Sequence, residues 1–153
     1  MKKVEFLALL QNKIIVFDGA MGTMLQAKGS LQPGMCPEML NITHPEAVAE
    51  VHRLYCAAGA DIVETNTFGA NRYKLTEYGL AEKVAAINYA AVKIARQAIS
   101  DNCLVAGSVG PTGKLLSPLG EVTFDDAYQC FREQVQALCT AGADLIIIET
   151  MTD

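Results

Sequence analysis

Two stretches of this sequence repeat almost the same helix-to-strand junction, and this repeat restricts the fold more than any other feature. Residues 57–65 read Ala-Ala-Gly-Ala-Asp-Ile-Val-Glu-Thr, and residues 140–150 read Thr-Ala-Gly-Ala-Asp-Leu-Ile-Ile-Ile-Glu-Thr. In each stretch, a glycine suited to ending a helix comes before a short apolar run typical of a buried strand. Because the unit of helix and strand recurs, the chain is expected to form an α/β fold with a parallel sheet.

The spacing of apolar residues and turn residues predicts the order of elements along the chain. We expect strands and helices at the following positions: strands at 14–17, 60–66, 104–109 and 145–150, and helices at about 6–13, 43–58, 81–100 and 123–141. Thr43 and Thr123 are expected to cap the helices that follow them, and Gly59 and Gly142 to end helices. Residues 28–41 are predicted to form an irregular loop or lid.

Polar side chains gather at the carboxyl ends of the predicted strands, whereas the opposite ends carry no such set of candidate residues. This asymmetry is typical of a (β/α)8 TIM barrel, whose chemistry lies at the carboxyl ends of the strands. Only about four strands are predicted, and a complete barrel has eight. We therefore expect residues 1–153 to be the first four β/α units, the N-terminal half of a barrel domain in a longer protein. A half-barrel that associates with itself is the alternative, because a lone half has unpaired sheet edges.

Composition excludes several classes of partner. The chain has 153 residues, is 51% hydrophobic and carries a net charge of −5 without any basic cluster. Nucleic acid and anionic membranes are therefore not expected partners. No apolar run reaches the roughly 18 residues of a membrane span, and the five cysteines form an odd, irregularly spaced set that argues against a disulfide framework. We expect a cytoplasmic protein.

Three acidic residues are the candidates for chemistry: Asp18, Glu64 and Glu149, each at the end of a predicted strand. Because parallel strands end at the same edge of a sheet, these carboxylates are expected to converge and to suit a substrate ammonium group. A divalent metal ion is an alternative ligand. A purely structural alternative is that Glu64 and Glu149 accept hydrogen bonds from the following loops. Gly19 and Gly22 would let the backbone approach a small molecule, since glycine lacks Cβ and tolerates positive φ.

Other chemistries have little support in the sequence. The glycine-rich residues 107–114 lack the spacing of a phosphate-binding loop, and no Gly-x-Ser-x-Gly motif of a serine nucleophile occurs. Cys130 and Cys139 are expected on opposite faces of one helix. His44 and His52 would lie about 12 Å apart along another helix, too far to share a metal ion. Cys36, in the irregular loop, is the only cysteine expected to be exposed, and all five are expected to be free of ligands.

Several motifs together resemble the homocysteine-binding domain of the cobalamin-dependent methionine synthases, within the homocysteine S-methyltransferase superfamily. In chain order, they are residues 18–25 (Asp-Gly-Ala-Met-Gly-Thr-Met-Leu), 40–46 (Leu-Asn-Ile-Thr-His-Pro-Glu), 58–71 (Ala-Gly-Ala-Asp-Ile-Val-Glu-Thr-Asn-Thr-Phe-Gly-Ala-Asn), 107–113 (Gly-Ser-Val-Gly-Pro-Thr-Gly) and 149–153 (Glu-Thr-Met-Thr-Asp). The resemblance covers essentially the whole chain and implies a (β/α)8 barrel that binds homocysteine.

The resemblance also implies roles for individual residues. Asp18 and the backbone of Gly19, Ala20 and Met21 match the position that receives the amino-acid part of homocysteine, and Glu149 matches the glutamate that contacts its amine. Glu64, Asn66 and Ser108 match positions that line the mouth of the barrel. In this family three cysteines on later strands bind zinc, and they have no counterpart here. The zinc ligands are therefore expected outside this chain, which is expected to contain neither a metal ligand nor a catalytic residue.

The implied activity is methyl transfer from methylcobalamin to the zinc-bound homocysteine thiolate, which gives methionine. The rest of the barrel and the folate- and cobalamin-binding modules would be the partners of this chain, and the isolated chain is expected to be inactive. Three alternatives remain open. The first is a homocysteine methyltransferase that uses betaine or S-methylmethionine as its methyl donor. The others are a non-catalytic half-barrel that acts as a binding module, and a generic metal-dependent barrel enzyme.

Overall fold

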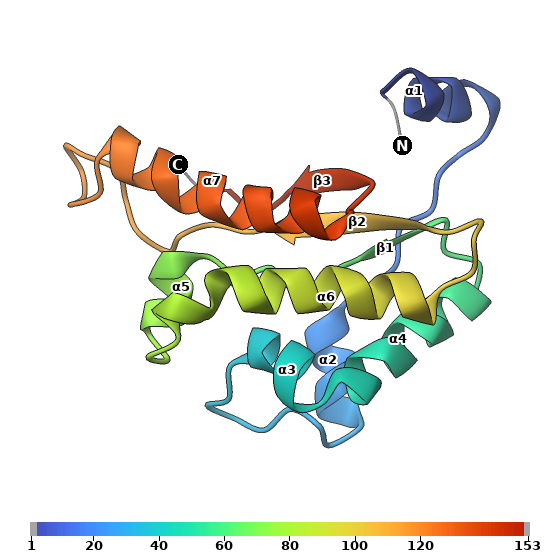
Figure 1. The fold of residues 1–153 in the computed structure, drawn as a ribbon, viewed down its shortest axis with the longest axis horizontal. Coiled ribbons are helices and arrows are strands. Elements are labelled where there is room, and N and C mark those ends of the chain that lie inside the picture. The colour runs from blue at the N-terminus through green and yellow to red at the C-terminus, as the bar shows by residue number, and fades with distance from the viewer. Residues whose placement is uncertain (1–2, 152–153) are drawn as a thin grey trace.

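A three-stranded parallel sheet in the order β1-β2-β3 lies at the centre of the computed structural model, which describes residues 3–151 (Figure 1). The strands are β1 (Ile62–Glu64), β2 (Leu104–Val109) and β3 (Leu145–Ile148). In the register, Val63 pairs with Val105, and Ser108 pairs with Ile147. The predicted α/β class with a parallel sheet is therefore confirmed.

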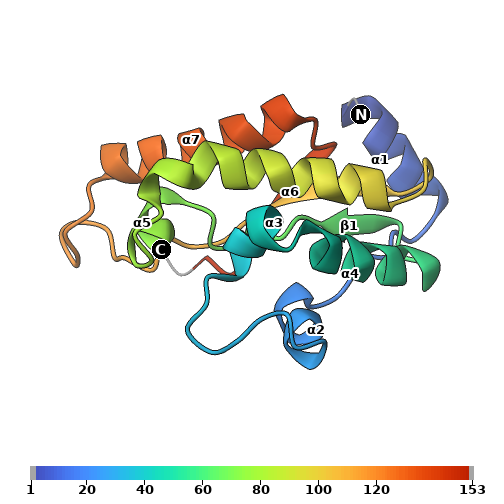
Figure 2. The same cartoon turned by 60° about the horizontal axis from the view of Figure 1, so that its bottom comes forward.

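Helices connect and cover the strands. They are α1 (Lys3–Asn12), α2 (Met21–Ala27), the 3-10 helix η1 (Pro37–Met39), α3 (Leu40–Thr43), α4 (Pro45–Ala57), α5 (Arg72–Thr76), the 3-10 helix η2 (Ala81–Lys83), α6 (Val84–Ala98) and α7 (Phe124–Ala141). Helices α6 and α7 lie side by side along the sheet, and α2 packs against α4 (Figures 1 and 2). None of the helices in residues 3–151 is long and apolar enough to cross a membrane.

Local signals in the sequence explain where the helices begin and end. The side chain of Thr123 accepts a hydrogen bond from the Asp126 N–H, and the Asp126 side chain accepts one from the Thr123 N–H, so α7 begins with a capping box. Gly142 follows this helix with φ +98°, and Gly59 follows α4 with φ +102°. Both backbones lie in the left-handed region that glycine adopts without strain. These predicted helix ends are confirmed.

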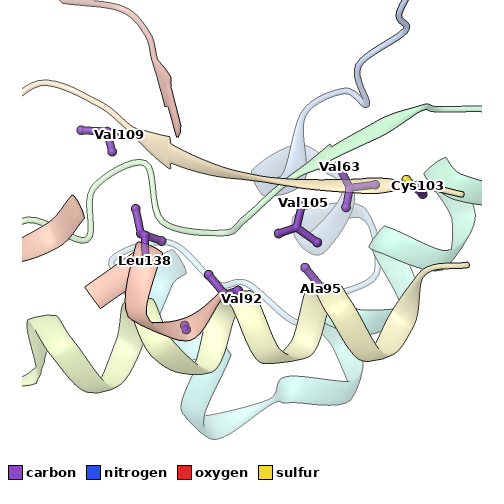
Figure 3. Close-up of a cluster of buried hydrophobic side chains, with 8 residues drawn as sticks. Val63, Val92, Ala95, Cys103, Val105, Val109 and Leu138 are labelled. Carbon is purple, nitrogen blue, oxygen red and sulfur yellow. The ribbon is translucent and has the colours of Figure 1, made fainter. Parts of the chain in front are cut away.

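The main core lies between the sheet and its helices. Val63, Val105 and Val109 of the strands pack against Val92 and Ala95 of α6 and Leu138 of α7, together with Cys103 and Ala141 (Figure 3). These side chains alternate along the strands with the ones that face the other side. Burial of this face against α6 and α7 leaves the opposite face, with Glu64 and Ser108, available for a site.

The first predicted strand differs from expectation. Residues 14–17 form only an isolated parallel bridge, between Phe17 and Ile62, although the Val16 carbonyl accepts hydrogen bonds from the Asp61 and Ile62 N–H groups. The side chains of Ile14 and Val16 are 89% and 52% exposed. The prediction of a buried strand here is therefore wrong. The physical reason is that, among residues 3–151, this segment meets a partner on one edge only.

Residues 28–41 are more ordered than predicted. After an irregular start, they form the turns η1 and α3 instead of a continuous loop. The hydroxyl of Thr43 donates to the Met39 carbonyl, four residues back within this helical segment. Thr43 is therefore not the cap of α4, as expected. His44 takes that position without a capping hydrogen bond, and Pro45 begins the helix. The sequence prediction also missed α2 and α5.

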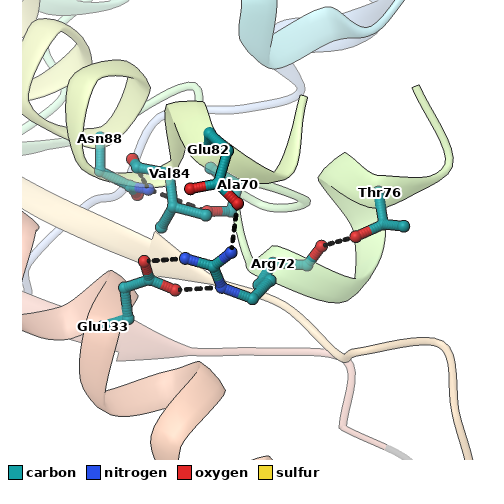
Figure 4. Close-up of polar contacts among 7 residues, drawn as sticks. All are labelled: Ala70, Arg72, Thr76, Glu82, Val84, Asn88 and Glu133. Carbon is teal, nitrogen blue, oxygen red and sulfur yellow. Dashed lines mark hydrogen bonds and ion pairs between the residues drawn. The ribbon is translucent and has the colours of Figure 1, made fainter. Parts of the chain in front are cut away.

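A set of polar contacts fastens α5 to its neighbours (Figure 4). The guanidinium of Arg72 donates to both carboxylate oxygens of Glu133 on α7, with N···O distances of 2.9 and 2.6 Å, and to Glu82 in η2 at 3.1 Å. The buried side chain of Asn88 donates to the Ala70 and Val84 carbonyls. These contacts fix the chain that leaves the carboxyl end of β1.

Candidate functional site

One cavity of about 520 Å³ lies at the carboxyl ends of the strands. Glu64 is the last residue of β1, Ser108 lies near the end of β2, and Glu149 directly follows β3. The cavity is lined by all eight residues that the sequence singled out, namely Asp18, Gly19, Ala20, Met21, Glu64, Asn66, Ser108 and Glu149, and also by Gly22, Pro37, Glu38, Thr65, Thr67 and Phe68. The expected convergence of the strand-end residues is therefore found, whereas their role in binding stays a prediction.

Further cavities lie away from the strand ends, and two of them serve for comparison. One of about 430 Å³ lies between α6 and α7, and one of about 670 Å³ lies mainly between α5 and α7. Both are lined by acidic and basic side chains together, such as Glu133 and Arg132 in the first. Of these three cavities in the described residues, the strand-end cavity alone gathers carboxylates without a lysine, arginine or histidine among its lining residues. We therefore take it as the candidate site.

Asp18 and Glu64 form the centre of the site. Both carboxylate oxygens of Asp18 lie 3.1 Å from the backbone nitrogen of Glu64, whose N–H donates to them. Burial raises the pKa of Asp18 from an ordinary value of 3.8 to about 7, although this N–H acts in the opposite direction. Burial, and then the charges of Glu149 and Asp18, raise the pKa of Glu64 from 4.5 to about 7. The site therefore gathers carboxyl groups whose ionised form is disfavoured by burial and by one another.

Glu149 is held by a side chain of the neighbouring strand. The Ser108 hydroxyl donates to Oε1 of Glu149 at 2.6 Å, and the Glu149 N–H donates to the Val109 carbonyl at 3.1 Å. Among the described residues, neither the Glu64 carboxylate nor the Glu149 carboxylate accepts a hydrogen bond from the loop that follows it. For Glu64 the purely structural alternative is therefore wrong, because its side chain lines the cavity instead. For Glu149, which only two described residues follow, that alternative stays a prediction.

The sequence prediction missed a fourth carboxylate, Glu38. Its side chain is buried, lines the cavity, and accepts hydrogen bonds from the Gly69 N–H at 2.7 Å and the Cys36 thiol at 3.2 Å. The segment that carries Glu38 is fastened to the end of β1 by Asn66, whose side-chain amide donates to the Pro37 carbonyl. These contacts join residues about 30 positions apart in the sequence and bring Glu38 to the site. Local sequence patterns therefore could not predict its place there.

Gly19 and Gly22, which follow Asp18, do not have the positive φ that the sequence suggested. A Cβ on Gly19 would lie 2.9 Å from the hydroxyl oxygen of Tyr55, which donates to the Ala20 carbonyl. A Cβ on Gly22 would meet nothing within 4 Å. A side chain at position 19 would therefore require Tyr55 to shift, whereas a side chain at position 22 would contact no other group.

The cysteines and histidines do not form a metal site in the part of the chain that is described. Residues 3–151 contain no group of three or more His, Cys, Asp or Glu side chains that could hold a metal ion. The alternative of a divalent ion on the strand-end carboxylates is therefore not supported. Cys130 is buried and Cys139 exposed, as expected for opposite helix faces. The expectation that Cys36 is exposed is wrong: its thiol is buried against Glu38, and burial raises its pKa to about 12.

Comparison with known proteins agrees with this geometry. A family model described as homocysteine S-methyltransferase matches residues 15–153, which include Thr152 and Asp153 outside the described residues. Methionine synthases from Mycobacterium leprae (strain TN) and Mycobacterium tuberculosis (strain ATCC 25618 / H37Rv) are 36% and 35% identical to this chain over 160 residues. Each alignment covers 97% of this chain and 13% of the relative.

Solved structures also show similarity to a homocysteine methyltransferase. The metallated form of the homocysteine methyltransferase MmuM from Escherichia coli superposes with a TM-score of 0.78 at 31% identity, covering 94% of this chain and 56% of that one. Its oxidized form gives a TM-score of 0.75 at 32% identity. The chain thus spans a small part of the methionine synthases and just over half of MmuM. With a family model matched along most of its length and its predicted residues gathered at one strand-end cavity, this chain belongs to the homocysteine S-methyltransferase family.

Proposed function

We propose that this chain binds homocysteine and supplies the amino-acid-binding part of a methionine synthase that methylates it. The observation that carries the proposal is the cavity at the strand ends, where Asp18, Glu64 and Glu149 converge without a basic side chain among the lining residues. A site of this charge favours a cationic ligand group. The similarity to methionine synthases and to a homocysteine methyltransferase supports homocysteine as the molecule that carries this group.

Homocysteine presents an ammonium group, a carboxylate and a thiol. In our proposal, the ammonium group lies between Asp18, Glu64 and Glu149, and the carboxylate accepts hydrogen bonds from the loop that follows Asp18. Within residues 3–151, the N–H groups of Gly19 and Ala20 donate to no other group. They are therefore available to a ligand. Asn66 and Ser108 shape the wall of the cavity, and the thiol extends toward its open side.

We further propose that residues 1–153 form the N-terminal part of a (β/α)8 barrel domain. The chain covers 56% of MmuM, and the exposed side chains of Ile14, Val16 and Ile148 offer apolar surface at the edges of the sheet. Further strands beside these edges would bury that surface. The remaining half of the barrel would then be a partner of this chain. The expected cytoplasmic location stays a prediction.

Zinc and cobalamin enter the proposal only as components bound elsewhere. The donor set of the described residues does not fit zinc, since it contains no group of three or more His, Cys, Asp or Glu side chains that could hold the ion. The zinc ligands are therefore assigned to the remaining half of the barrel, and cobalamin to another module. We assign to this chain the binding and orientation of the amino-acid part of the substrate, and no step of methyl transfer. The isolated chain is accordingly expected to form no methionine.

Titration calorimetry tests the proposal. The purified chain is titrated with L-homocysteine and with 4-mercaptobutyrate, which has the same skeleton without the amine. We expect homocysteine to bind at least about tenfold more tightly, because an ammonium group between carboxylates makes charge-assisted hydrogen bonds. The difference should shrink in Asp18→Asn and persist in Asp101→Asn, a control at an exposed acidic residue outside the cavity. Equal affinity for both ligands, or no binding, would contradict the proposal.

A further inference from the structure

A closed ring of hydrogen bonds lies directly beneath the carboxylates of the site. The Ser108 N–H donates to the Thr65 hydroxyl oxygen at 3.1 Å, and the Thr67 hydroxyl donates to the Ser108 carbonyl at 2.7 Å. The two threonine hydroxyls lie 2.6 Å apart. Since the Thr67 hydrogen is used on Ser108, Thr65 donates to Thr67, and every hydroxyl of the ring both donates and accepts. Thr65, Thr67 and Ser108 are all buried.

Gln134 of α7 holds this ring from the side of the helices. Its side chain is fully buried, and its Nε2 lies 2.8 Å from the Thr67 carbonyl and 3.5 Å from the Ser108 carbonyl. Its Oε1 has no hydrogen-bond partner among the described residues. The amide therefore acts here through its NH2 group alone. A buried glutamine oxygen without a partner costs stability, which makes a purely stabilising role an incomplete explanation for this residue.

The Ser108 hydroxyl connects the ring to the substrate site, because it donates a hydrogen bond to the Glu149 carboxylate. With the backbone of Ser108 fixed on both its N–H and its carbonyl, the Ser108 hydroxyl is held where it donates to Oε1 of Glu149 at 2.6 Å. Hydrogen bonds in such chains polarise and strengthen one another. A change at Gln134 is thus transmitted through Ser108 to the Glu149 carboxylate, although Gln134 itself is not among the residues that line the cavity.

We propose that Gln134 is a positioning residue of the substrate site: through Thr67 and the Ser108 carbonyl it fixes the Ser108 hydroxyl, which orients the Glu149 carboxylate toward the substrate ammonium group. The assignment of the ammonium group rests on the function proposed above. The positioning of Glu149 itself rests only on the geometry of the ring. The two parts are therefore tested by separate measurements.

The first measurement needs no ligand. The 13C resonance of the Glu149 side-chain carboxyl is recorded in the full chain and in Gln134→Met, Ser108→Ala and the double variant. We expect both single variants to shift the resonance, and the double variant to shift it no more than Ser108→Ala does. Gln136→Met is the matched control, because Gln136 lies two residues away on α7 and is exposed. An unchanged resonance in Gln134→Met, or additive shifts in the double variant, would overturn the proposal.

The second measurement uses the ligands. We expect Gln134→Met to weaken homocysteine binding about fivefold, the effect of one lost hydrogen bond, and to leave 4-mercaptobutyrate binding unchanged. An equal loss for both ligands would mean that Gln134 acts only on folding, and it would overturn the proposal. If the wild-type chain binds no homocysteine, the proposed function fails, and the resonance alone decides the role of Gln134.

Thr67→Val serves as a second variant in case Gln134→Met does not fold. If Gln134→Met lacks the thermal transition of the wild type, Thr67→Val replaces it in both measurements, since it removes the hydroxyl of the ring from the other side. Thr67→Ser is its conservative partner, and it should restore the resonance and the affinity because it keeps the hydroxyl. Failure of Thr67→Ser to restore either of them would overturn the proposal.

Discussion

The backbone N–H of Glu64 donates to both carboxylate oxygens of Asp18, at 3.1 Å each. This contact joins the segment before α2 to the end of β1, and it places two half-buried acidic side chains together in the strand-end cavity. Burial raises the pKa of both carboxyl groups to about 7. The protonation state of the site is therefore expected to change near neutral pH, and the predictions for ligand binding and stability follow from this.

Homocysteine binding is expected to strengthen as pH rises from 6 to 8. An ammonium ligand needs ionised carboxylates, and those of Asp18 and Glu64 lose their protons around pH 7. We expect the affinity to increase about tenfold or more over this interval and to level off above it. Calorimetry in buffers of different ionisation enthalpy should show proton release at pH 7. A flat profile in the wild type would contradict the assignment, and Asp18→Asn should reduce the slope.

Glu64→Gln is expected to stabilise the chain at pH 8 but not at pH 4. The pKa of Glu64 is higher in the folded state, about 7, than its ordinary value of 4.5. The folded state therefore binds the proton more tightly, and wild-type stability falls as pH rises from 4.5 to 7. Glutamine avoids this loss. Because Glu64 is only half-buried, we discount the full linkage value to about 1 kcal/mol.

Urea unfolding at both pH values measures this difference. Glu121→Gln is the matched control, because Glu121 is exposed in the loop before α7, and it should change stability little at either pH. A Glu64→Gln variant that is less stable than the wild type at pH 8 would show that the carboxylate is a net stabilising group.

Gly19→Ala and Gly22→Ala are expected to have opposite effects. A Cβ on Gly19 would lie 2.9 Å from the hydroxyl oxygen of Tyr55 and would displace it from the Ala20 carbonyl, whereas a Cβ on Gly22 meets nothing within 4 Å. We expect Gly19→Ala to cost about 1 kcal/mol. Gly22→Ala, inside α2, should gain about 0.5 kcal/mol because alanine favours the helix.

Thermal unfolding distinguishes the two glycine variants, and Tyr55→Phe serves as the control for the lost hydrogen bond. In the Tyr55→Phe background, Gly19→Ala should cost less than in the wild type, since the closest atom that a Cβ would meet is absent. Equal costs in both backgrounds would show that the steric explanation is wrong.

Arg72→Lys is expected to loosen the contact between α5 and α7. Arg72 donates to both oxygens of Glu133 and also to Glu82, and lysine cannot reproduce this planar, two-point contact. The pair is partly exposed, so we expect a loss of about 0.5–1 kcal/mol in urea unfolding. Arg53→Lys is the matched control, because Arg53 pairs with the exposed Glu46 on α4. A loss no larger than that of the control would refute the stabilising role of this contact.

Much of the fold could be predicted because its signals are local. The bounds of β2 agree with the prediction at 104–109, and Thr123 and Gly142 mark the two ends of α7. A capping hydrogen bond or a left-handed glycine involves residues a few positions apart, so the sequence carries the whole pattern. The convergence of Asp18, Glu64 and Glu149 could also be predicted, because the carboxyl ends of parallel strands lie at one edge of a sheet.

The remaining features depend on contacts between distant parts of the chain. Residues 14–17 look like a buried strand by composition, but burial depends on what covers a segment, and among the described residues this one pairs on a single edge. Glu38 reaches the cavity only because Asn66 fastens its segment to β1, and Gln134 meets the Ser108 ring from 26 residues away along the chain.

The sequence by itself thus determined the positions of β1, β2, β3, α4, α6 and α7 and the acidic end of the sheet, because local patterns of residues carry these signals, whereas it missed α2 and α5. The tertiary structure decided which groups are desolvated. It set the raised pKa values of Asp18 and Glu64, the burial of Glu38 and Cys36 and the close approach of Gly19 to Tyr55, because burial and steric contact depend on distances across the fold.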